Sequence, residues 1–307
     1  MKQSMSGVEV KNLNRSESKS ILVFGAAGML GHMLVRTLSD SHRVVGTTSH
    51  VFGRSGKLAE ILPRERCVDL LDVREFVKVE QTIRYWQPDV VVNCVGLIKH
   101  KMNDDRVLDA VLLNSVFPHQ LAQLCNELKI RLIHFSTDCV FEGSPGPKRL
   151  TDAPNATDIY ATTKRLGEVG HGTSLTLRTS FVGRQIVGTE ELVEWIISQR
   201  SGQITAYKNA IYSGLTTRAL SDVVRQVIER HPSLVGLYQV ASSPITKFDL
   251  ITYLNDKLRL NITINPDTEF FCDRTLDGSD FSRVTGIQVP SWEQMLNEFC
   301  SDQAFYS

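Results

Sequence analysis

Residues 21–31 have the sequence ILVFGAAGMLG, and this stretch decides the fold. Four consecutive apolar residues that end at a glycine predict a short buried strand, and helical spacing of apolar residues follows from Met29 to Ser39. Glycines at positions 25, 28 and 31 permit a tight turn and bring the pyrophosphate of a dinucleotide close to the helix N-terminus. A Gly-rich turn before an ordinary helix is the simpler alternative, and the order of strand, glycines and helix argues against it.

The second predicted strand, residues 43–47, bears on the choice of cofactor. An NAD-selective protein usually carries Asp or Glu at the end of this strand, where the carboxylate binds the ribose hydroxyls. Here residues 47–50 are Thr, Thr, Ser and His, and Arg54 follows closely. Because no carboxylate stands there to repel a 2′-phosphate, we expect NADP(H) to be preferred, with NAD(H) as the alternative.

Strands and helices alternate along the first part of the chain. The mostly apolar segments 89–93 and 130–135 are typical of parallel strands that are covered on both faces. Polar or small residues follow them at 94–96 and 136–137, where a parallel sheet places its binding crevice. We therefore predict the α/β class with a doubly wound parallel sheet, the Rossmann fold. Residues 104–128 are expected to form one long amphipathic helix.

The alternation weakens beyond Gly183, which predicts a smaller, discontinuous C-terminal α/β lobe. We predict a dinucleotide-binding domain over 20–183 plus 214–240 and a substrate-binding lobe over 184–213 plus 241–300. In this lobe a strand is expected at 261–264, followed by a loop-rich end. Residues 1–19 are polar and lack the apolar core of a secretion signal, so we expect a disordered N-terminal extension.

Composition limits the expected partners. The chain has 307 residues, 42% of them hydrophobic, with 34 basic and 34 acidic side chains, which suits a large buried core. Zero formal net charge with scattered basic residues gives no reason to expect nucleic acid or a membrane surface as a partner. The 6 cysteines form no C-x-x-C pair and have no histidines at metal spacing. We expect buried free thiols, no metal site and a cytoplasmic location.

Tyr160 and Lys164 are the strongest catalytic candidates. They stand four apart on a predicted helix and therefore project from the same face, one turn apart. An ammonium near a phenol is expected to lower the phenol pKa toward working pH, which makes the phenol a usable acid for a carbonyl reduction. Alone the pair also fits a solvated helix face. Ser136 and Thr137, at the end of an apolar strand, strengthen the catalytic interpretation because they add a hydroxyl.

With these residues in place, the chain resembles the extended short-chain dehydrogenase/reductase superfamily from about residue 20 to residue 296. Within it, the chain is most similar to the dTDP-4-dehydrorhamnose reductase group of sugar-nucleotide 4-ketoreductases. The resemblance rests on GAAGMLG at 25–31, STDCVFEG at 136–143, YATTKRLGE at 160–168, LRTS at 177–180 and DRTLD at 273–277.

The resemblance implies a function and a set of site residues. The implied reaction is reduction of the 4-keto group of a nucleotide-activated deoxysugar for surface polysaccharide precursors, by an enzyme that is often a homodimer. Catalytic roles fall on Thr137, Tyr160 and Lys164, with Asn114 as a support for the lysine. Cofactor contacts fall on Gly25, Gly28, Met29, Leu30, Gly31, Asp69, Leu70, Cys94, Val95, Gly96, Tyr160 and Lys164. Substrate contacts fall on Thr137, Cys139, Phe181 and Arg274.

Position 139 separates the related enzyme classes. The rhamnose reductases usually carry an aromatic residue where Cys139 stands, so the sugar stays open. Related 4,6-dehydratases carry a glutamate there, and fucose-type epimerase-reductases carry a cysteine together with a histidine after the sixth strand. Residues 181–205 contain no histidine, which favours plain ketone reduction. The alternatives are an epimerase-reductase and a non-catalytic NADP-binding regulatory subunit, such as that of methionine adenosyltransferase.

Overall fold

The computed structural model describes residues 18–51 and 56–306. Most of the predicted N-terminal extension therefore lies outside the described residues, and so does Arg54. Within the described part, no helix is both long and apolar enough to cross a membrane.

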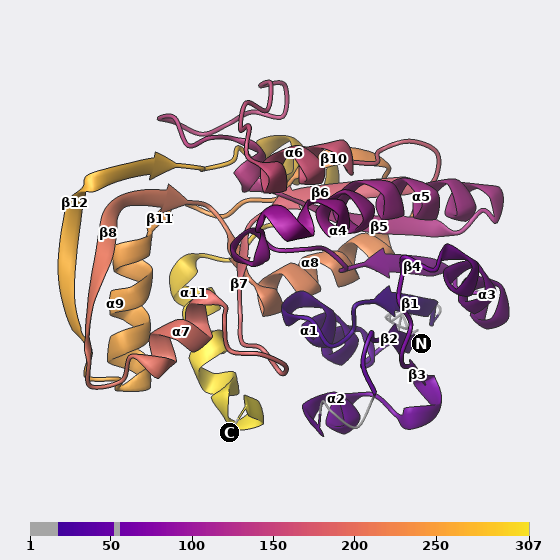
Figure 1. Cartoon of the computed structure of the whole chain (residues 1–307), viewed down its shortest axis with the longest axis horizontal. Coiled ribbons are helices and arrows are strands. Elements are labelled where there is room, and N and C mark those ends of the chain that lie inside the picture. The colour runs from indigo at the N-terminus through magenta and orange to yellow at the C-terminus, as the bar shows by residue number, and fades with distance from the viewer. Residues whose placement is uncertain (1–17, 52–55, 307) are drawn as a thin grey trace, which may run out of the picture.

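A seven-stranded parallel sheet forms the centre of the molecule (Figure 1). The strand order is β10-β6-β5-β4-β1-β2-β3, so the order reverses direction between β1 and β4. This is the doubly wound arrangement predicted from the sequence, with its crevice at the carboxyl ends of β1 and β4. The strands are β1 Ser20–Phe24, β2 Arg43–Thr47, β3 Cys67–Val68, β4 Val90–Asn93, β5 Arg131–Thr137, β6 Ser174–Thr179 and β10 Gly236–Gln239.

Helices cover both faces of this sheet because alternate residues of each strand point to opposite sides. Ile21 and Val23 of β1 belong to the core under α1 and α8, while Leu22 and Phe24 belong to the core under α3 and α5. The rings of Phe24 and Phe117 meet edge to face on that second side. The helices are α1 Met29–Leu38, α2 Gly56–Ile61, α3 Phe76–Trp86, α5 Phe117–Glu127, α6 Ile159–Leu166 and α8 Thr217–Arg230.

The single long helix expected over 104–128 is interrupted. A short α4 (Val107–Val111) runs into a π-helical segment at Leu112–Val116, and α5 then begins. Pro118 has no N–H to continue the regular ladder, and π-helical turns inside helices often occur at functional sites. Here the π segment carries Asn114, whose side chain bonds to the loop that follows β4.

A smaller α/β part is built on a three-stranded sheet of order β11-β8-β12. β12 runs parallel to β8 and β11 runs antiparallel to it. This sheet stands at one end of the central sheet, with α9 beside it (Figure 1). Its elements are α7 Leu192–Ser198, β8 Gln203–Tyr212, β11 Ile245–Thr246, α9 Lys247–Leu258 and β12 Thr263–Asp273.

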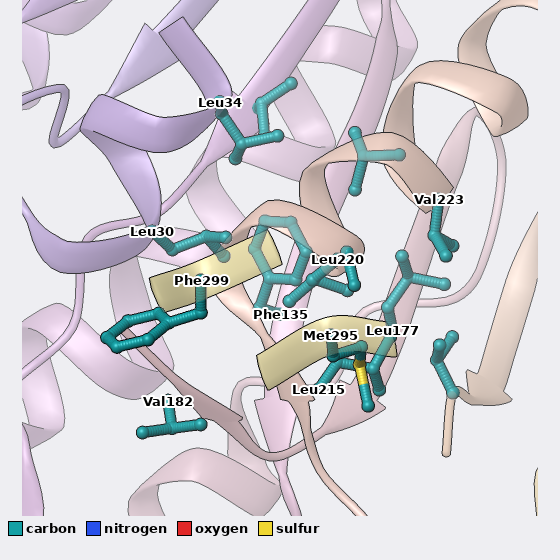
Figure 2. Close-up of a cluster of buried hydrophobic side chains, with 14 of the residues drawn as sticks. Leu30, Leu34, Phe135, Leu177, Val182, Leu215, Leu220, Val223, Met295 and Phe299 are labelled. Atoms are coloured by element: carbon teal, nitrogen blue, oxygen red, sulfur yellow. The ribbon is translucent and has the colours of Figure 1, made fainter. Parts of the chain in front are cut away.

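The C-terminal helices α10 (Ser279–Thr285) and α11 (Trp292–Ser301) return to the main core. Figure 2 shows Met295 and Phe299 of α11 beside Leu220 of α8 and Phe135 of β5. A short parallel pair, β7 (Phe181–Val182) and β9 (Leu215–Thr216), adds Val182 and Leu215 to the same cluster. The residue boundaries proposed for the two domains remain a prediction, since this core includes residues from both.

Candidate functional site

The turn after β1 has the shape that its glycines predict. Gly25 has a φ of +79°, a left-handed conformation that favours glycine. A Cβ on Gly31 would lie 2.0 Å from the carbonyl oxygen of Gly25, so only glycine fits there. Among the described residues no side chain caps the N-terminus of α1, and its first turn contains no acidic residue. The turn therefore fits an anionic pyrophosphate near Gly28, Met29 and Leu30.

The segment after β4 lies against this turn. A Cβ placed on Gly25 would come within 3.3 Å of the Cys94 backbone and of the Val95 side chain. A Cβ placed on Gly96 would come within 3.1 Å of Asn114 Oδ1 and 3.9 Å of Lys164 Nζ. The predicted cofactor residues 94–96 are thus brought between the glycine turn and the predicted catalytic lysine.

Asp69 and Leu70 follow β3 at the outer end of the same sheet edge. Leu70 has a φ of +56° and is 61% exposed, which is unusual for a large apolar residue. The Leu71 N–H donates to Thr48 O at 2.9 Å, which holds this segment beside the end of β2. An exposed leucine at this edge suits contact with a flat adenine ring.

Helix α6 presents the predicted catalytic pair. Asp158 caps its N-terminus by accepting from the Ala161 N–H at 3.0 Å. The ammonium of Lys164 donates to Phe135 O at 2.7 Å, and burial lowers the pKa of Lys164 to about 8. Asn114 bonds to both backbone groups of Leu97 and to Thr163 Oγ1, so it ties the loop after β4 to the residue beside Lys164.

The pKa of Tyr160 differs from the sequence-based expectation. Burial raises it above the usual value, and Cys139 raises it further, while the Thr137 hydroxyl works in the opposite direction. The expected lowering by Lys164 was therefore wrong, since the ammonium is bonded to a strand carbonyl. A protonated Tyr160 is the form that reduction needs, because reduction consumes a proton.

Thr137 stands at the end of β5, and its hydroxyl lies within a small polar cluster. It donates to Asp138 Oδ1 at 3.1 Å and accepts from the Cys139 N–H at the same distance. Burial raises the pKa of the Asp138 carboxyl, and Arg274 opposes that shift. Thr137 is thereby held next to Tyr160 in a defined orientation.

A cavity of about 480 Å³ opens between the central sheet and the smaller α/β part. The predicted substrate residues Cys139, Phe181 and Arg274 line it together with Met29 of the dinucleotide turn. Arg274 donates from Nε to Phe141 O at 3.0 Å and approaches Cys139 Sγ at 3.6 Å from Nη1. Burial raises the pKa of the Cys139 thiol to about 12, so it stays protonated near neutral pH.

The family model of the RmlD substrate binding domain matches residues 19–305, nearly the whole described chain. The chain belongs to this family.

Three known proteins are similar to this RmlD-family chain in sequence or in fold. A probable dTDP-4,6-dihydroxy-2-methyloxan-3-one 4-ketoreductase of Streptomyces antibioticus is 32% identical, over 75% of this chain and 74% of its own length. A dTDP-4-dehydrorhamnose reductase of Shigella flexneri is 26% identical, over 93% and 99%. The structure of a dTDP-4-dehydrorhamnose reductase of Bacillus anthracis, in complex with NADP, has a TM-score of 0.75 at 21% identity, covering 92% and 98%. The last comparison supports the fold.

Several cavity residues of this RmlD-family chain were missed by sequence reasoning. They are the charged residues Lys99, Asp138, Glu191 and Lys247 and the aromatic residues Tyr207 and Phe270, whose ring centroids lie 4.6 Å apart. Only Asp138 had a signal in the sequence, because it follows Thr137 directly. The others come from loops and from the smaller sheet, where spacing gives no indication of a shared cavity.

Glu191 is the most consequential of these residues. It lines the cavity, and burial raises the pKa of its carboxyl, while His100 lies 3.7 Å away and opposes that shift. The segment after β6 therefore places a carboxyl group at the cavity even though it contains no histidine.

Proposed function

We propose that this chain is an NADPH-dependent reductase of the 4-keto group of a nucleotide-activated deoxysugar. The proposal rests on one observation. The dinucleotide turn lies at the same edge of the sheet as Thr137, Tyr160 and Lys164. The names of the two similar curated reductases supply the substrate class, because both act on dTDP sugars. Such a sugar nucleotide is a precursor for surface polysaccharide.

The residues have separate roles in this reaction. When bound, the dinucleotide supplies a hydride to the ketone carbon. Tyr160 gives its phenolic proton to the ketone oxygen, and the Thr137 hydroxyl turns from Asp138 to hydrogen-bond the same oxygen. Lys164 binds the nicotinamide ribose, and its charge favours release of the proton from Tyr160.

The cofactor contacts are proposed at the turn and along the sheet edge. Gly25, Gly28, Met29, Leu30 and Gly31 surround the pyrophosphate. Residues 69–70 contact the adenine, and residues 94–96 lie along the nicotinamide half. NADP(H) is preferred because residues 47–50 contain no carboxylate. Fluorescence titration is expected to give a Kd for NADPH about tenfold below that for NADH, and a tenfold preference for NADH would reject the assignment.

The direct test of the reaction is a panel of 4-keto sugar nucleotides that differ in nucleotide and sugar. Oxidation of NADPH should follow addition of at least one dTDP-linked 4-keto-6-deoxysugar, and the product should be the corresponding alcohol by NMR. Binding of NADPH without turnover of any panel member would favour the non-catalytic regulatory subunit. Retention of Tyr160, Lys164 and Thr137 together argues against that alternative, since a binding subunit needs none of their chemistry.

Glu191 favours a second candidate, an epimerase-reductase. Epimerisation beside a ketone needs an acid and a base near the reacting carbon, and the cavity wall offers Cys139 and Glu191. Because the protonated Cys139 thiol is a poor base, plain reduction is favoured over epimerisation with reduction. In heavy water, reduction alone places no deuterium on the carbons that flank the ketone. Deuterium there, lost in Cys139→Ser or Glu191→Gln, would establish the epimerase-reductase instead.

We also propose that the protein is a homodimer and that it is located in the cytoplasm. Helix α4 packs against α6, and both carry exposed apolar side chains, namely Leu108, Val111, Ile159 and Leu166. A second copy would bury this face. Light scattering should give twice the chain mass for the protein and a monomer for Leu108→Lys with Leu166→Lys. The cytoplasm suits free thiols, and all 6 cysteines are free.

A further inference from the structure

His32 lies under the dinucleotide turn and is fully buried in the first turn of α1. Its Nδ1 is 2.9 Å from Gly28 O, and its Nε2 is 2.7 Å from the hydroxyl of Tyr306. Burial lowers the pKa of His32 to about 4, so the ring is neutral at neutral pH. A neutral imidazole has one donor and one acceptor. Because a carbonyl only accepts, Nδ1 donates to Gly28 and Nε2 accepts from Tyr306.

This arrangement fixes one peptide unit of the turn. Gly28 O accepts from the backbone N–H of His32 at 3.0 Å as well as from the ring. The peptide that joins Gly28 to Met29 is planar, so a fixed carbonyl also fixes the opposite direction of the Met29 N–H. That N–H belongs to the helix N-terminus where the pyrophosphate is proposed to bind.

Tyr306 belongs to a short helical segment, residues 302–306, that packs along α1. Asp302 accepts from Arg36 Nη1 at 2.5 Å, and the Arg36 guanidinium lies 4.6 Å from the centroid of the Phe305 ring. His32 and Arg36 are one turn apart on α1, so the segment contacts one face of that helix twice. These contacts hold Tyr306 against His32.

The same segment also contacts Arg184, the sequence neighbour of a residue in the cavity wall. The Arg184 guanidinium lies 5.0 Å from the centroid of the Tyr306 ring, and its Nη1 donates to Gln303 Oε1. Its Nε donates to Glu194 of α7 at 2.6 Å. Arg184 follows directly after Gly183, which lines the cavity.

We propose that Tyr306 is a positioning residue for the dinucleotide turn, acting through His32, and that the 302–306 segment joins this turn to the cavity wall. The inference rests on the proposed function, because it takes the ligand of the turn to be a dinucleotide. The Tyr306 hydroxyl donates to His32 Nε2 and so holds the ring in place, and the His32 Nδ1–H holds the direction of the Gly28–Met29 peptide. Cofactor affinity therefore depends on a hydroxyl that lies outside the turn and bonds to His32.

Tyr306→Phe tests the inference because it removes this hydroxyl and keeps the ring. The Kd for NADPH should rise about fivefold, the effect of losing about 1 kcal/mol, while kcat at saturating NADPH stays nearly unchanged. The matched control is Tyr253→Phe, which removes a hydroxyl that donates to Asn297 Oδ1 at 2.7 Å, between α9 and α11. This control should leave the Kd for NADPH unchanged.

A second measurement does not depend on the cofactor. Hydrogen exchange of the amides of residues 25–31 in the free protein should be faster in Tyr306→Phe than in the wild type and in Tyr253→Phe. Equal exchange in all three proteins, or equal Kd values for NADPH, would overturn the inference. If the wild type bound neither NADPH nor NADH, the proposed function would fail, and the exchange result would still decide whether Tyr306 holds the turn.

Discussion

The proposed dinucleotide turn is built from the backbone of residues 25–31, whereas the proposed substrate cavity is lined by side chains from positions as far apart as Met29 and Arg274. In the turn, glycine is required because any Cβ at Gly31 would collide with a carbonyl oxygen. In the cavity, charged and aromatic groups from two sheets face one space. A site made of local backbone is visible in the sequence, and a site made of distant side chains becomes visible only after folding.

Tyr160 and Lys164 lie where these two regions meet, and the largest effect is expected there. Tyr160→Phe should lower turnover of the 4-keto sugar nucleotide by roughly 10² to 10⁴ and leave the Kd for NADPH nearly intact, because only the proton donor is lost. Steady-state kinetics and fluorescence titration measure the two quantities separately. A variant that keeps most of its turnover would remove Tyr160 from the mechanism.

Lys164 should also leave a signature in the stability of the free protein. Its folded pKa of about 8 lies below the ordinary value of 10.5, so between these values the unfolded chain binds more protons than the folded chain. Stability therefore rises with pH across this interval, by up to about 3 kcal/mol from this group. Urea denaturation at pH 8 and pH 10.5 should show a smaller rise in Lys164→Met. An identical rise in both proteins would mean that Lys164 is not desolvated.

The turn should respond to a single methyl group. Gly31→Ala is expected to raise the Kd for NADPH about thirtyfold, because the turn must shift at a cost of about 2 kcal/mol. Gly56→Ala is the matched control, since within the described chain no atom lies within 4 Å of a Cβ at that glycine. If Gly31→Ala changed the KM for the sugar nucleotide and left the Kd for NADPH unchanged, the contrast drawn between the turn and the cavity would be wrong.

The same contrast explains what the sequence could predict. The sheet and its family were predictable because buried parallel strands such as β4 are mostly apolar and the motifs at 25–31 and 160–164 are local. Strand β12 was expected over 261–264, but it extends to Asp273, past Pro266. It pairs with β8 at the rim of the molecule, and both of its faces carry polar residues. Its sequence therefore lacks the apolar pattern by which a buried strand is predicted. The raised pKa of Tyr160 depends on burial, which no spacing of residues reveals.

The smallest effect tests the cavity alone. Lys247 begins α9 and lines the cavity, and within the described residues its ammonium has no hydrogen bond or ion pair, although its charge opposes the raised pKa of Asp138. Its ammonium can therefore meet a phosphate of the substrate without first breaking a contact. Lys247→Ala should raise the KM for the sugar nucleotide about fivefold, about 1 kcal/mol, with no change in the Kd for NADPH.

Lys208→Ala is the control on the same lobe, because its ammonium lies over the Phe248 ring at 5.0 Å. An equal rise in KM for both variants would show that the lobe attracts the substrate by its general charge. The specific contact between Lys247 and a substrate phosphate would then be wrong.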